Sequence, residues 1–370
     1  MLLAVWVVLI LLGFIYRKSK KLTIVQITYV SLMIAFNNGN PDQYDYMLSF
    51  NRIRDSFSNI FSGNILYNIL MWIFGIFNNY NIAILLLVFL SLGIMYKGVK
   101  YYTDKTSFVF SLYLIAPFTI DATQVKNFVA MAIWIYFSKF LYEAFKREKT
   151  AKNILIYVIG VMITSLFHFS FIFAFVYVFI IYVDKKHIHR MILFMGIYAA
   201  IYFALKNIQY VLPFLNATQI SYLRLFVVKY DAYAANYIIE RGSTRLITTG
   251  IFYLVTFLVF LLQSILENKR ENNEKLFREF ALKLTIISLF TLPLISVSIE
   301  IYRMQRNLLC IYYIMVALQS LPALRIYSGK WLLNSNIISS LFVIGGAIFY
   351  MYIETILWNY ENVFCVLFRI

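Results

Sequence analysis

The sequence predicts an all-α fold, a polytopic transmembrane helix bundle of about 12 spans that forms a single integral membrane domain over residues 1–370. Hydrophobic residues make up 62% of the chain and charged residues 14%, whereas soluble domains are nearer about 45–50% and 25%. The mean hydropathy of +0.76 agrees with this composition. Long apolar runs recur along the whole chain, and Lys and Arg gather in alternate segments between them. Together these observations indicate repeated crossings of a lipid bilayer.

Each predicted span is an apolar run without a charge in its central portion. A charge at the bilayer centre costs several kcal/mol, so uncharged centres are expected of lipid-embedded helices. The first run is followed by a basic cluster and lacks a small-residue cleavage site, so it is interpreted as a retained span. The predicted spans are 2–16, 22–37, 82–96, 107–120, 127–142, 153–167, 169–183, 191–205, 246–265, 281–298, 307–323 and 332–353.

Two apolar stretches need separate interpretation. As one helix, residues 153–183 would be about 46 Å long, which exceeds the hydrocarbon core of about 30 Å. We therefore predict two spans there, with a turn at Phe167-His168-Phe169. Residues 64–77 are apolar enough to span, but a crossing there would export the basic segment 97–105. Charge asymmetry favours a re-entrant or interfacial segment at 64–77.

The orientation follows from six segments that hold 21 of the 33 Lys and Arg residues. The positive-inside rule places these segments in the cytoplasm, which puts both chain termini outside. On this topology, residues 37–63 and 206–245 form outer-face loops, and residues 267–278 form a cytoplasmic charged loop. The net charge of +16 is then a membrane-orientation signal, and no nucleic-acid partner is predicted. The basic segments are 17–21, 97–105, 146–152, 185–190, 269–283 and 325–330.

Several function classes are disfavoured by what the sequence lacks. It contains no Gly-rich phosphate loop, and its two cysteines, Cys310 and Cys365, belong to no metal-spaced cluster. No cytoplasmic segment is long enough to form a nucleotide-binding domain. We therefore predict no cofactor, no metal site and no direct use of ATP.

The predicted outer face nevertheless retains Arg and Lys residues close to span ends. Arg suits bidentate contacts with phosphate oxygens, so these cations point to an anionic ligand such as a lipid-linked pyrophosphate. The alternative is that they are snorkelling anchors or contacts with lipid headgroups. His168 is the only histidine inside an apolar run, which makes it either a general base or a hydrogen-bonded structural residue.

Four local patterns follow one another along the chain: Asn40-Pro41-Asp42-Gln43-Tyr44-Asp45-Tyr46, Gln124-Val125-Lys126-Asn127-Phe128-Val129-Ala130, His168-Phe169-Ser170, and Tyr302-Arg303-Met304-Gln305-Arg306-Asn307. In this order they resemble the EpsG-like family of bacterial membrane proteins, which is grouped with Wzy-type polysaccharide polymerases. The resemblance covers roughly residues 1–325, and the region after residue 330 adds nothing to it. Two positions depart from the family pattern: Gln43 stands where Tyr is usual, and Lys126 stands where Arg is usual.

The resemblance implies a polymerase of a lipid-linked surface polysaccharide in the bacterial cytoplasmic membrane. Its substrate would be an oligosaccharide linked to undecaprenyl pyrophosphate, and its other partners would be the bilayer and polysaccharide assembly proteins. Cations must then stabilise the leaving pyrophosphate, and a base must accept the proton of the attacking hydroxyl. The pyrophosphate candidates are Arg303, Arg306, Lys126 and Arg52; the base candidates are His168 and, as an alternative, Asp42; the sugar candidates are Tyr46, Tyr302, Gln124 and Asn127.

Three other functions stay open at this point. Another lipid-linked glycosyltransferase or a glycan ligase would differ from a polymerase in the length of its products. A transporter or flippase of polysaccharide or lipid-linked glycan would be expected to show charged or broken helices at the membrane midplane. A non-enzymatic scaffold would tolerate loss of the outer-face Arg and His residues.

Overall fold

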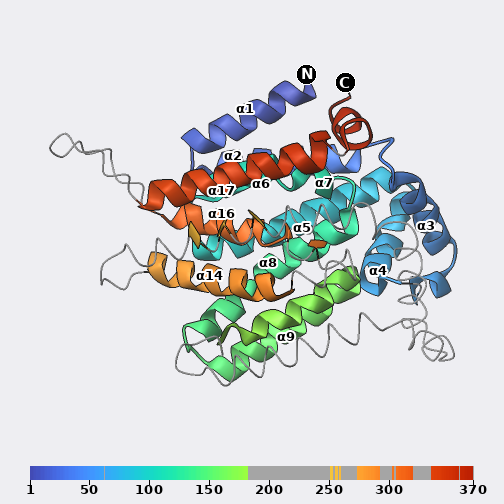
Figure 1. Cartoon of the computed structure of the whole chain (residues 1–370). Helices are drawn as coiled ribbons and strands as arrows, with labels where there is room; N and C mark the ends of the chain where they lie inside the picture. Colours follow the sequence, from blue (N-terminus) through green and yellow to red (C-terminus); the bar gives the residue numbers. More distant parts are fainter. Residues whose placement is uncertain are drawn as a thin grey trace.

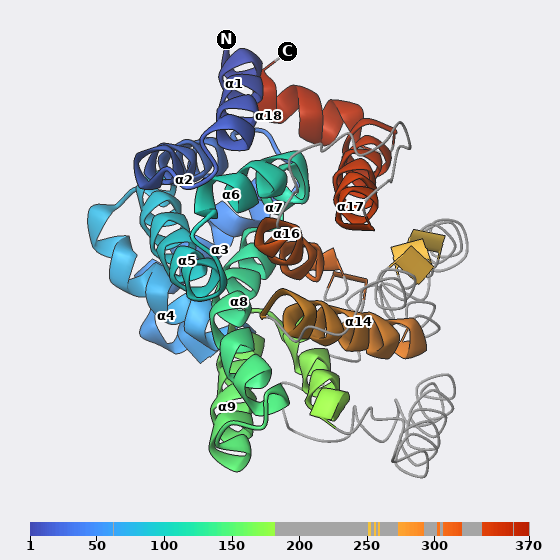
Figure 2. The same cartoon turned by 90° about the vertical axis from the view of Figure 1, so that its left-hand side faces the viewer.

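The computed structural model describes residues 1–61, 63–181, 251–252, 255–256, 258–259, 273–291, 302–303, 306–319, 335–357 and 359–369. Every regular element in these ranges is helical, which confirms the predicted all-α class for this part of the chain. Figure 1 shows the longer helices lying side by side, and Figure 2 views the same bundle after a quarter turn.

The helices follow one another with short connections through the first half of the chain. Their bounds are α1 Leu2–Ile15, α2 Lys20–Ala35, α3 Gln43–Asp55, the 3-10 helix η1 Phe57–Phe61, α4 Ile65–Phe74, η2 Gly75–Phe77, α5 Tyr80–Tyr102, α6 Thr106–Ile115, α7 Phe118–Asp121, α8 Val125–Phe145, α9 Thr150–Phe167, the 3-10 helix η3 Phe169–Ile181, α14 Asn273–Thr291, α16 Leu309–Leu318, α17 Ser335–Met351, the π-helices η7 Tyr352–Leu357 and η8 Tyr360–Cys365, and α18 Val366–Phe368.

The predicted number of spans is not confirmed. Among the described residues, four helices are long and apolar enough to cross a membrane: Tyr80–Tyr102, Val125–Phe145, Thr150–Phe167 and Ile337–Leu357. Other apolar runs form shorter helices, because local breaks limit helix length. For example, the predicted span 107–120 is divided at Pro117, whose preceding residue is pushed out of the helical region. The predicted span 191–205 and most of the span 246–265 lie outside the described residues.

The predicted turn in the long apolar stretch 153–183 is confirmed. Helix α9 ends at Phe167, and His168 adopts an extended conformation, with φ −152° and ψ 122°. The chain then runs back along α9 as η3. The contact between them is shown by the Tyr157 hydroxyl, which donates a hydrogen bond of 2.9 Å to the Ala174 carbonyl. A single long helix could not bring these two residues together.

Helix α8 lies in the centre of the bundle, between α5 and α9 (Figure 2). Gly98 allows α5 to approach α8 closely, since a Cβ at that position would lie 2.9 Å from the Tyr136 Cα atom. On the other side, Trp134 donates a hydrogen bond of 3.1 Å to the Tyr157 hydroxyl of α9. Helix α8 is therefore fixed between its neighbours, and the residues of its first turn are fixed with it.

The basic segments described by the structure gather at one end of the bundle. The backbone amide of Phe108 donates to the Arg17 carbonyl at 3.4 Å, and the Lys105 ammonium donates to the Gln319 carbonyl at 3.0 Å. We call this the basic end. The charged segment predicted as a loop at 267–278 is helical from Asn273 onward, because α14 begins there.

The opposite end, which we call the site end, carries α3, α4, α7 and both chain termini (Figure 1). The Trp6 and Phe368 rings lie 5.2 Å apart there, so the first and last helices meet. The segment 37–63, predicted as a loop, contains α3 and η1. The predicted outer loop 206–245 lies outside the described residues.

Segment 64–77 forms α4 and η2 at the site end. The Phe50 ring in α3 and the Tyr80 ring at the start of α5 are 5.8 Å apart, so the chain leaves and returns at the same end. This path agrees with the predicted re-entrant or interfacial segment. The orientation of the two ends relative to a membrane stays a prediction.

Candidate functional site

Three separate parts of the chain meet at the site end: the start of α3, the start of α8, and the part that contains Arg303 and Arg306. The loop before α3 is fixed by amide side chains. Asn37 donates a hydrogen bond of 3.2 Å to the Ala122 carbonyl, and the Asn40 side-chain oxygen accepts from the Asp42 amide at 3.1 Å. Asp42 is therefore held at the first residue before α3, facing the segment that leads into α8.

Lys126 lies in the first turn of α8, between two aromatic rings. Its ammonium nitrogen is 4.9 Å from the centre of the Tyr46 ring and 4.8 Å from the centre of the Tyr67 ring. Attraction between a cation and the face of an aromatic ring fixes the position of such an ammonium group. Tyr46 comes from α3 and Tyr67 from α4, so these two helices place Lys126.

Asp42 shares its surroundings with two cations. Burial raises the pKa of the Asp42 carboxyl above its ordinary value; the Arg303 guanidinium and the Lys126 ammonium act in the opposite direction, and Asp45 adds to the increase. Both cations therefore act electrostatically on one carboxylate, although they are 177 residues apart in sequence. We call Asp42, Lys126 and Arg303 the cation cluster.

A buried ion pair lies beside this cluster. Arg306 donates hydrogen bonds of 3.0 Å to the Asp121 carboxylate and 3.1 Å to the Gln124 side-chain oxygen. The side chains of Arg306 and Asp121 are 1% and 0% exposed. Tyr113 donates a further hydrogen bond of 3.2 Å to Asp121. In this arrangement the charge of Arg306 is compensated within the protein.

Two buried amide side chains next to these cations have no protein partner among the described residues. Asn127 follows Lys126 and is 1% exposed, and Asn307 follows Arg306 and is 0% exposed. Neither the nitrogen nor the oxygen of either amide makes a hydrogen bond to a protein group. Because buried polar groups are normally paired, these amides are suited to contact a ligand or bound water. The role of Asn127 in substrate binding stays a prediction.

Tyr302 contacts the C-terminal part of the chain. Its hydroxyl donates a hydrogen bond to the Glu354 carboxylate and lies 2.8 Å from the Tyr350 hydroxyl. Glu354 is buried and also interacts electrostatically with Arg306. Glu354 was not among the predicted site residues, because the resemblance does not include residues beyond 330. A single carboxylate at the end of an apolar run was the one sequence feature that could have indicated it.

His168 lies at the C-terminal end of α9. Its Nδ1 atom is 2.7 Å from the Ser170 hydroxyl and accepts a bond of 3.4 Å from the Ser170 amide. A ring nitrogen that accepts from a backbone amide carries a lone pair, which assigns the proton of the neutral ring to Nε2. The basic nitrogen therefore faces Ser170. The contacts described for His168 lie in its own turn, at the end of the bundle that α9 shares with α4.

Arg52 is placed apart from the other pyrophosphate candidates. It is exposed on α3, ten residues beyond Asp42, which corresponds to about 15 Å along a helix. Of the ten candidate residues, the structure thus connects Asp42, Tyr46, Lys126 and Arg303 in one group. It connects Gln124 with Arg306 in an adjacent group.

Comparison with known proteins gives one match. A model of the EpsG family matches residues 20–363, which includes all the segments that build the site and extends past Glu354. No curated protein and no solved structure matches the chain.

Proposed function

Because the chain belongs to the EpsG family, we propose that it is a polymerase of a lipid-linked surface polysaccharide. Family membership suggests a polysaccharide polymerase-like role, and the apolar helices suggest a membrane protein. The proposed reaction transfers a growing glycan from undecaprenyl pyrophosphate to a hydroxyl group of a new lipid-linked repeat unit. It takes place at the outer face of the bacterial cytoplasmic membrane.

The proposed chemistry needs one base and a set of cations. The acceptor hydroxyl oxygen attacks the anomeric carbon of the donor, and the bond from that carbon to the pyrophosphate oxygen breaks. The electron pair leaves with the pyrophosphate, and the hydroxyl proton passes to the base. Cations that face the leaving oxygens lower the barrier, because negative charge grows there in the transition state.

The proposal is supported by the site end, where Lys126 lies against the Tyr46 and Tyr67 rings and both Lys126 and Arg303 act electrostatically on the Asp42 carboxylate. In such an arrangement the two cations can bind a pyrophosphate on one side of a reacting centre. The carboxylate can then act as the base on the other side. Tyr46 lies against Lys126, so its ring can pack on a sugar bound at the same place. Tyr302, Gln124 and Asn127 remain candidates for contacts with the glycan.

Arg306 has a supporting role in this proposal, because its charge is compensated by Asp121. Its ion pair with Asp121 and its hydrogen bond to Gln124 tie Arg306 to the segment that leads into α8. Arg306 therefore supports the position of Lys126 and Arg303 relative to each other. The exposed Arg52 lies too far along α3 to act together with Asp42 in this arrangement.

The base is assigned to His168 or Asp42. The Nδ1 atom of His168 lies 2.7 Å from the Ser170 hydroxyl, so a proton could reach it through that hydroxyl. Asp42 lies within electrostatic range of both cations, and burial raises its pKa toward the range that suits a base. Substitution of each residue separates the two assignments.

The test uses a strain without the gene, complemented with variants, and measures the length of lipid-linked glycans together with the membrane level of the protein. Arg303→Ala and Lys126→Ala should each lower polymer formation by about a hundredfold or more, with single repeat units accumulating on lipid. Lys126→Arg keeps the charge and should retain polymer.

Arg54→Ala is the matched control, because Arg54 is an exposed cation of α3 paired with Asp55 at the surface. It should give normal polymer. Normal polymer from Arg303→Ala and Lys126→Ala at normal membrane levels would overturn the proposal. Accumulation of full-length polymer on lipid, in place of single units, would favour a ligase.

A further inference from the structure

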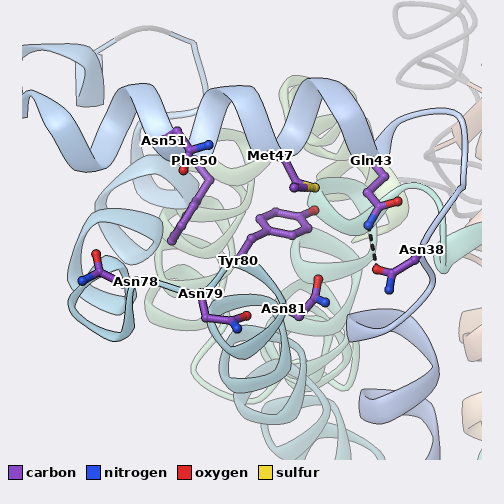
Figure 3. Close-up of a pocket in the computed structure, with 9 residues that line it drawn as sticks. All are labelled: Asn38, Gln43, Met47, Phe50, Asn51, Asn78, Asn79, Tyr80 and Asn81. Carbon is purple, nitrogen blue, oxygen red and sulfur yellow. Dashed lines mark hydrogen bonds between the residues drawn. The ribbon is translucent and has the colours of Figure 1, made fainter.

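A pocket of about 430 Å³ opens at the site end, next to the cation cluster and distinct from it (Figure 3). It lies between α3 and the turn that precedes α5. Most of its lining residues carry side-chain amides, which come from three segments of the chain. These residues are Asn38, Gln43, Asn51, Asn78, Asn79 and Asn81.

The rest of the lining is apolar or aromatic. Figure 3 shows Tyr80 reaching from the start of α5 toward α3, where Met47 and Phe50 lie above it. The Tyr80 and Phe50 rings are 5.8 Å apart in an edge-to-face arrangement. None of the side chains that line the pocket carries a charge. The pocket therefore offers an aromatic surface surrounded by neutral donors and acceptors.

Some of the amides are already used by the protein. Gln43 donates a hydrogen bond of 2.7 Å to the Asn38 side-chain oxygen, which joins these two residues at one end of the pocket (Figure 3). The Asn79 side-chain oxygen accepts a bond of 3.1 Å from the Ile82 amide and so caps α5. The amides that make no hydrogen bond to any protein group in the described part of the chain are those of Asn51, Asn78 and Asn81.

Turn and capping chemistry explains only part of this set. Asn78 has a φ of 51°, a left-handed conformation that Asn tolerates well, and Asn79 is an ordinary helix cap. Asn51 and Asn81 lie within α3 and α5, where Asn is a poor helix former. Both line the same pocket, where their solvent-accessible amides are open to a ligand with hydroxyl groups.

We propose that this pocket binds an uncharged saccharide unit of the lipid-linked acceptor glycan, an inference that rests on the proposed function. An amide can donate to one hydroxyl and accept from another, and an aromatic face can pack on the C–H face of a sugar ring. The volume falls in the range of about 300–1,000 Å³ typical of small-ligand sites. The absence of lining charges selects neutral sugars over uronic acids or phosphate.

The location of the pocket connects it with the chemistry. Gln43 directly follows Asp42, and the Tyr80 hydroxyl lies within electrostatic range of the Asp42 carboxylate. A sugar bound on Tyr80 would therefore present its hydroxyl groups near Asp42, the carboxylate on which Lys126 and Arg303 act. This is the position that an acceptor sugar needs.

The binding test uses the full chain in lipid nanodiscs and saturation-transfer NMR with neutral hexoses and N-acetylhexosamines, as mono- and disaccharides. Wild type should bind at least one of these probes saturably. Asn51→Ala/Asn81→Ala should raise its Kd about tenfold or more, because two hydrogen-bonding side chains are lost. Asn64→Ala, which removes a site-end amide outside the pocket, should leave the Kd unchanged.

Salt gives a second readout. Sugar binding should not change between low and high ionic strength, since no charge lines the pocket, whereas pyrophosphate binding to Lys126 and Arg303 should weaken. If the double variant does not reach normal membrane levels, Asn51→Ala alone serves, because Asn51 is an exposed position in the middle of α3. That single variant should raise the Kd by about threefold or more.

The pocket proposal is overturned if wild type binds none of the probes, or if the Asn51 variants bind like wild type. These outcomes are separate from failure of the proposed function. Normal polymer from Arg303→Ala with pocket-dependent sugar binding would leave the pocket standing and remove the polymerase. Loss of polymer in Arg303→Ala, together with sugar binding that the Asn51 variants do not change, would support the polymerase and remove the pocket proposal.

Discussion

At the scale of single residues, the cations of the site end differ in their surroundings. Arg306 lies against Asp121 without solvent access, whereas Lys126 lies between two rings and acts with Arg303 on Asp42. The sequence pattern does not distinguish the three cations, because all of them follow or precede apolar runs.

The buried ion pair should dominate the stability of this region. Arg306→Met leaves the Asp121 carboxylate buried without its cation, and we expect a loss of about 3–5 kcal/mol in the free energy of unfolding. Arg306→Met combined with Asp121→Leu should recover part of that loss, since the Asp121 carboxylate is then no longer buried without its cation. Thermal unfolding in nanodiscs measures both. Equal destabilisation by the single and double variants would contradict the pairing.

The pH dependence of polymer formation should identify the base. Burial raises the Asp42 pKa, and a base must be deprotonated, so a rate that depends on Asp42 should fall with acid at a pH above the ordinary value of about 4. If the base is His168, Asp42→Asn should keep the pH dependence of the wild type. Initial rates with lipid-linked repeat units in vesicles, from pH 4 to pH 8, distinguish the two.

The stability of the Asp42 variant provides the control for that experiment. Because the pKa of Asp42 is higher in the folded than in the unfolded state, its contribution to stability decreases as pH rises through the unfolded value. Asp42→Asn should therefore keep or increase stability at neutral pH. Loss of activity without loss of stability would support a role in the chemistry.

At the scale of helices, close packing along α8 sets the geometry of the site. Helix α5 approaches α8 at Gly98, and the chain of contacts continues from Trp134 to Tyr157 in α9. A shift of α8 along its axis would move Lys126 relative to the rings that hold it. Packing in the middle of the bundle thus positions residues at its end.

Two glycines of α5 test this packing directly. A Cβ at Gly98 would lie 2.9 Å from Tyr136 backbone atoms, whereas a Cβ at Gly93 would meet nothing within 4 Å. Gly98→Ala should therefore lower the free energy of unfolding by about 1–3 kcal/mol. Gly93→Ala should be neutral or stabilising by up to about 1 kcal/mol, because Ala favours helix. Similar unfolding temperatures for the two variants would contradict the close approach.

Helix α3 shows why the segment 37–63 was predicted as a loop. The prediction relied on continuous apolar runs, and α3 is polar along most of its length, with Phe50 and Ile53 as its buried residues. Contacts made by those residues in the folded chain stabilise the helix. By contrast, the turn at His168 was predictable, because a length limit and flanking charge leave one solution.

At the scale of the whole molecule, the bundle has two chemically different ends. The basic segments described by the structure meet at one end, and both termini lie with α3 and the cation cluster at the other. The proposed function requires the site end to face outward.

Thiol labelling tests this orientation in a Cys365→Ser background, since Cys310 is buried. Ser58→Cys at the site end should react with a membrane-impermeant thiol reagent on intact cells. Ala151→Cys at the basic end should react only after permeabilisation, because both positions are exposed but lie on opposite sides. The reverse pattern would place the cation cluster in the cytosol and remove the proposed function.

The candidate site was partly predictable from sequence. Asp42, Tyr46, Lys126 and Arg303 were proposed from local patterns, and the structure brings them together. Glu354 and the pairing of Arg306 were missed. No local pattern reports a contact between residues 185 positions apart, which is the separation of Arg306 from Asp121.

The all-helical class, the alternation of basic segments and the reversal at His168 could be read from the amino-acid order. Each depends on short-range properties: hydropathy, charge and the length of a run. The lengths of the helices, the pairing of Arg306 with Asp121, and the amide-lined pocket near Asp42 emerge in the folded chain. These depend on packing between distant segments, because an electrostatic or hydrogen-bonded partner acts over a few ångströms in space, whatever its distance along the chain.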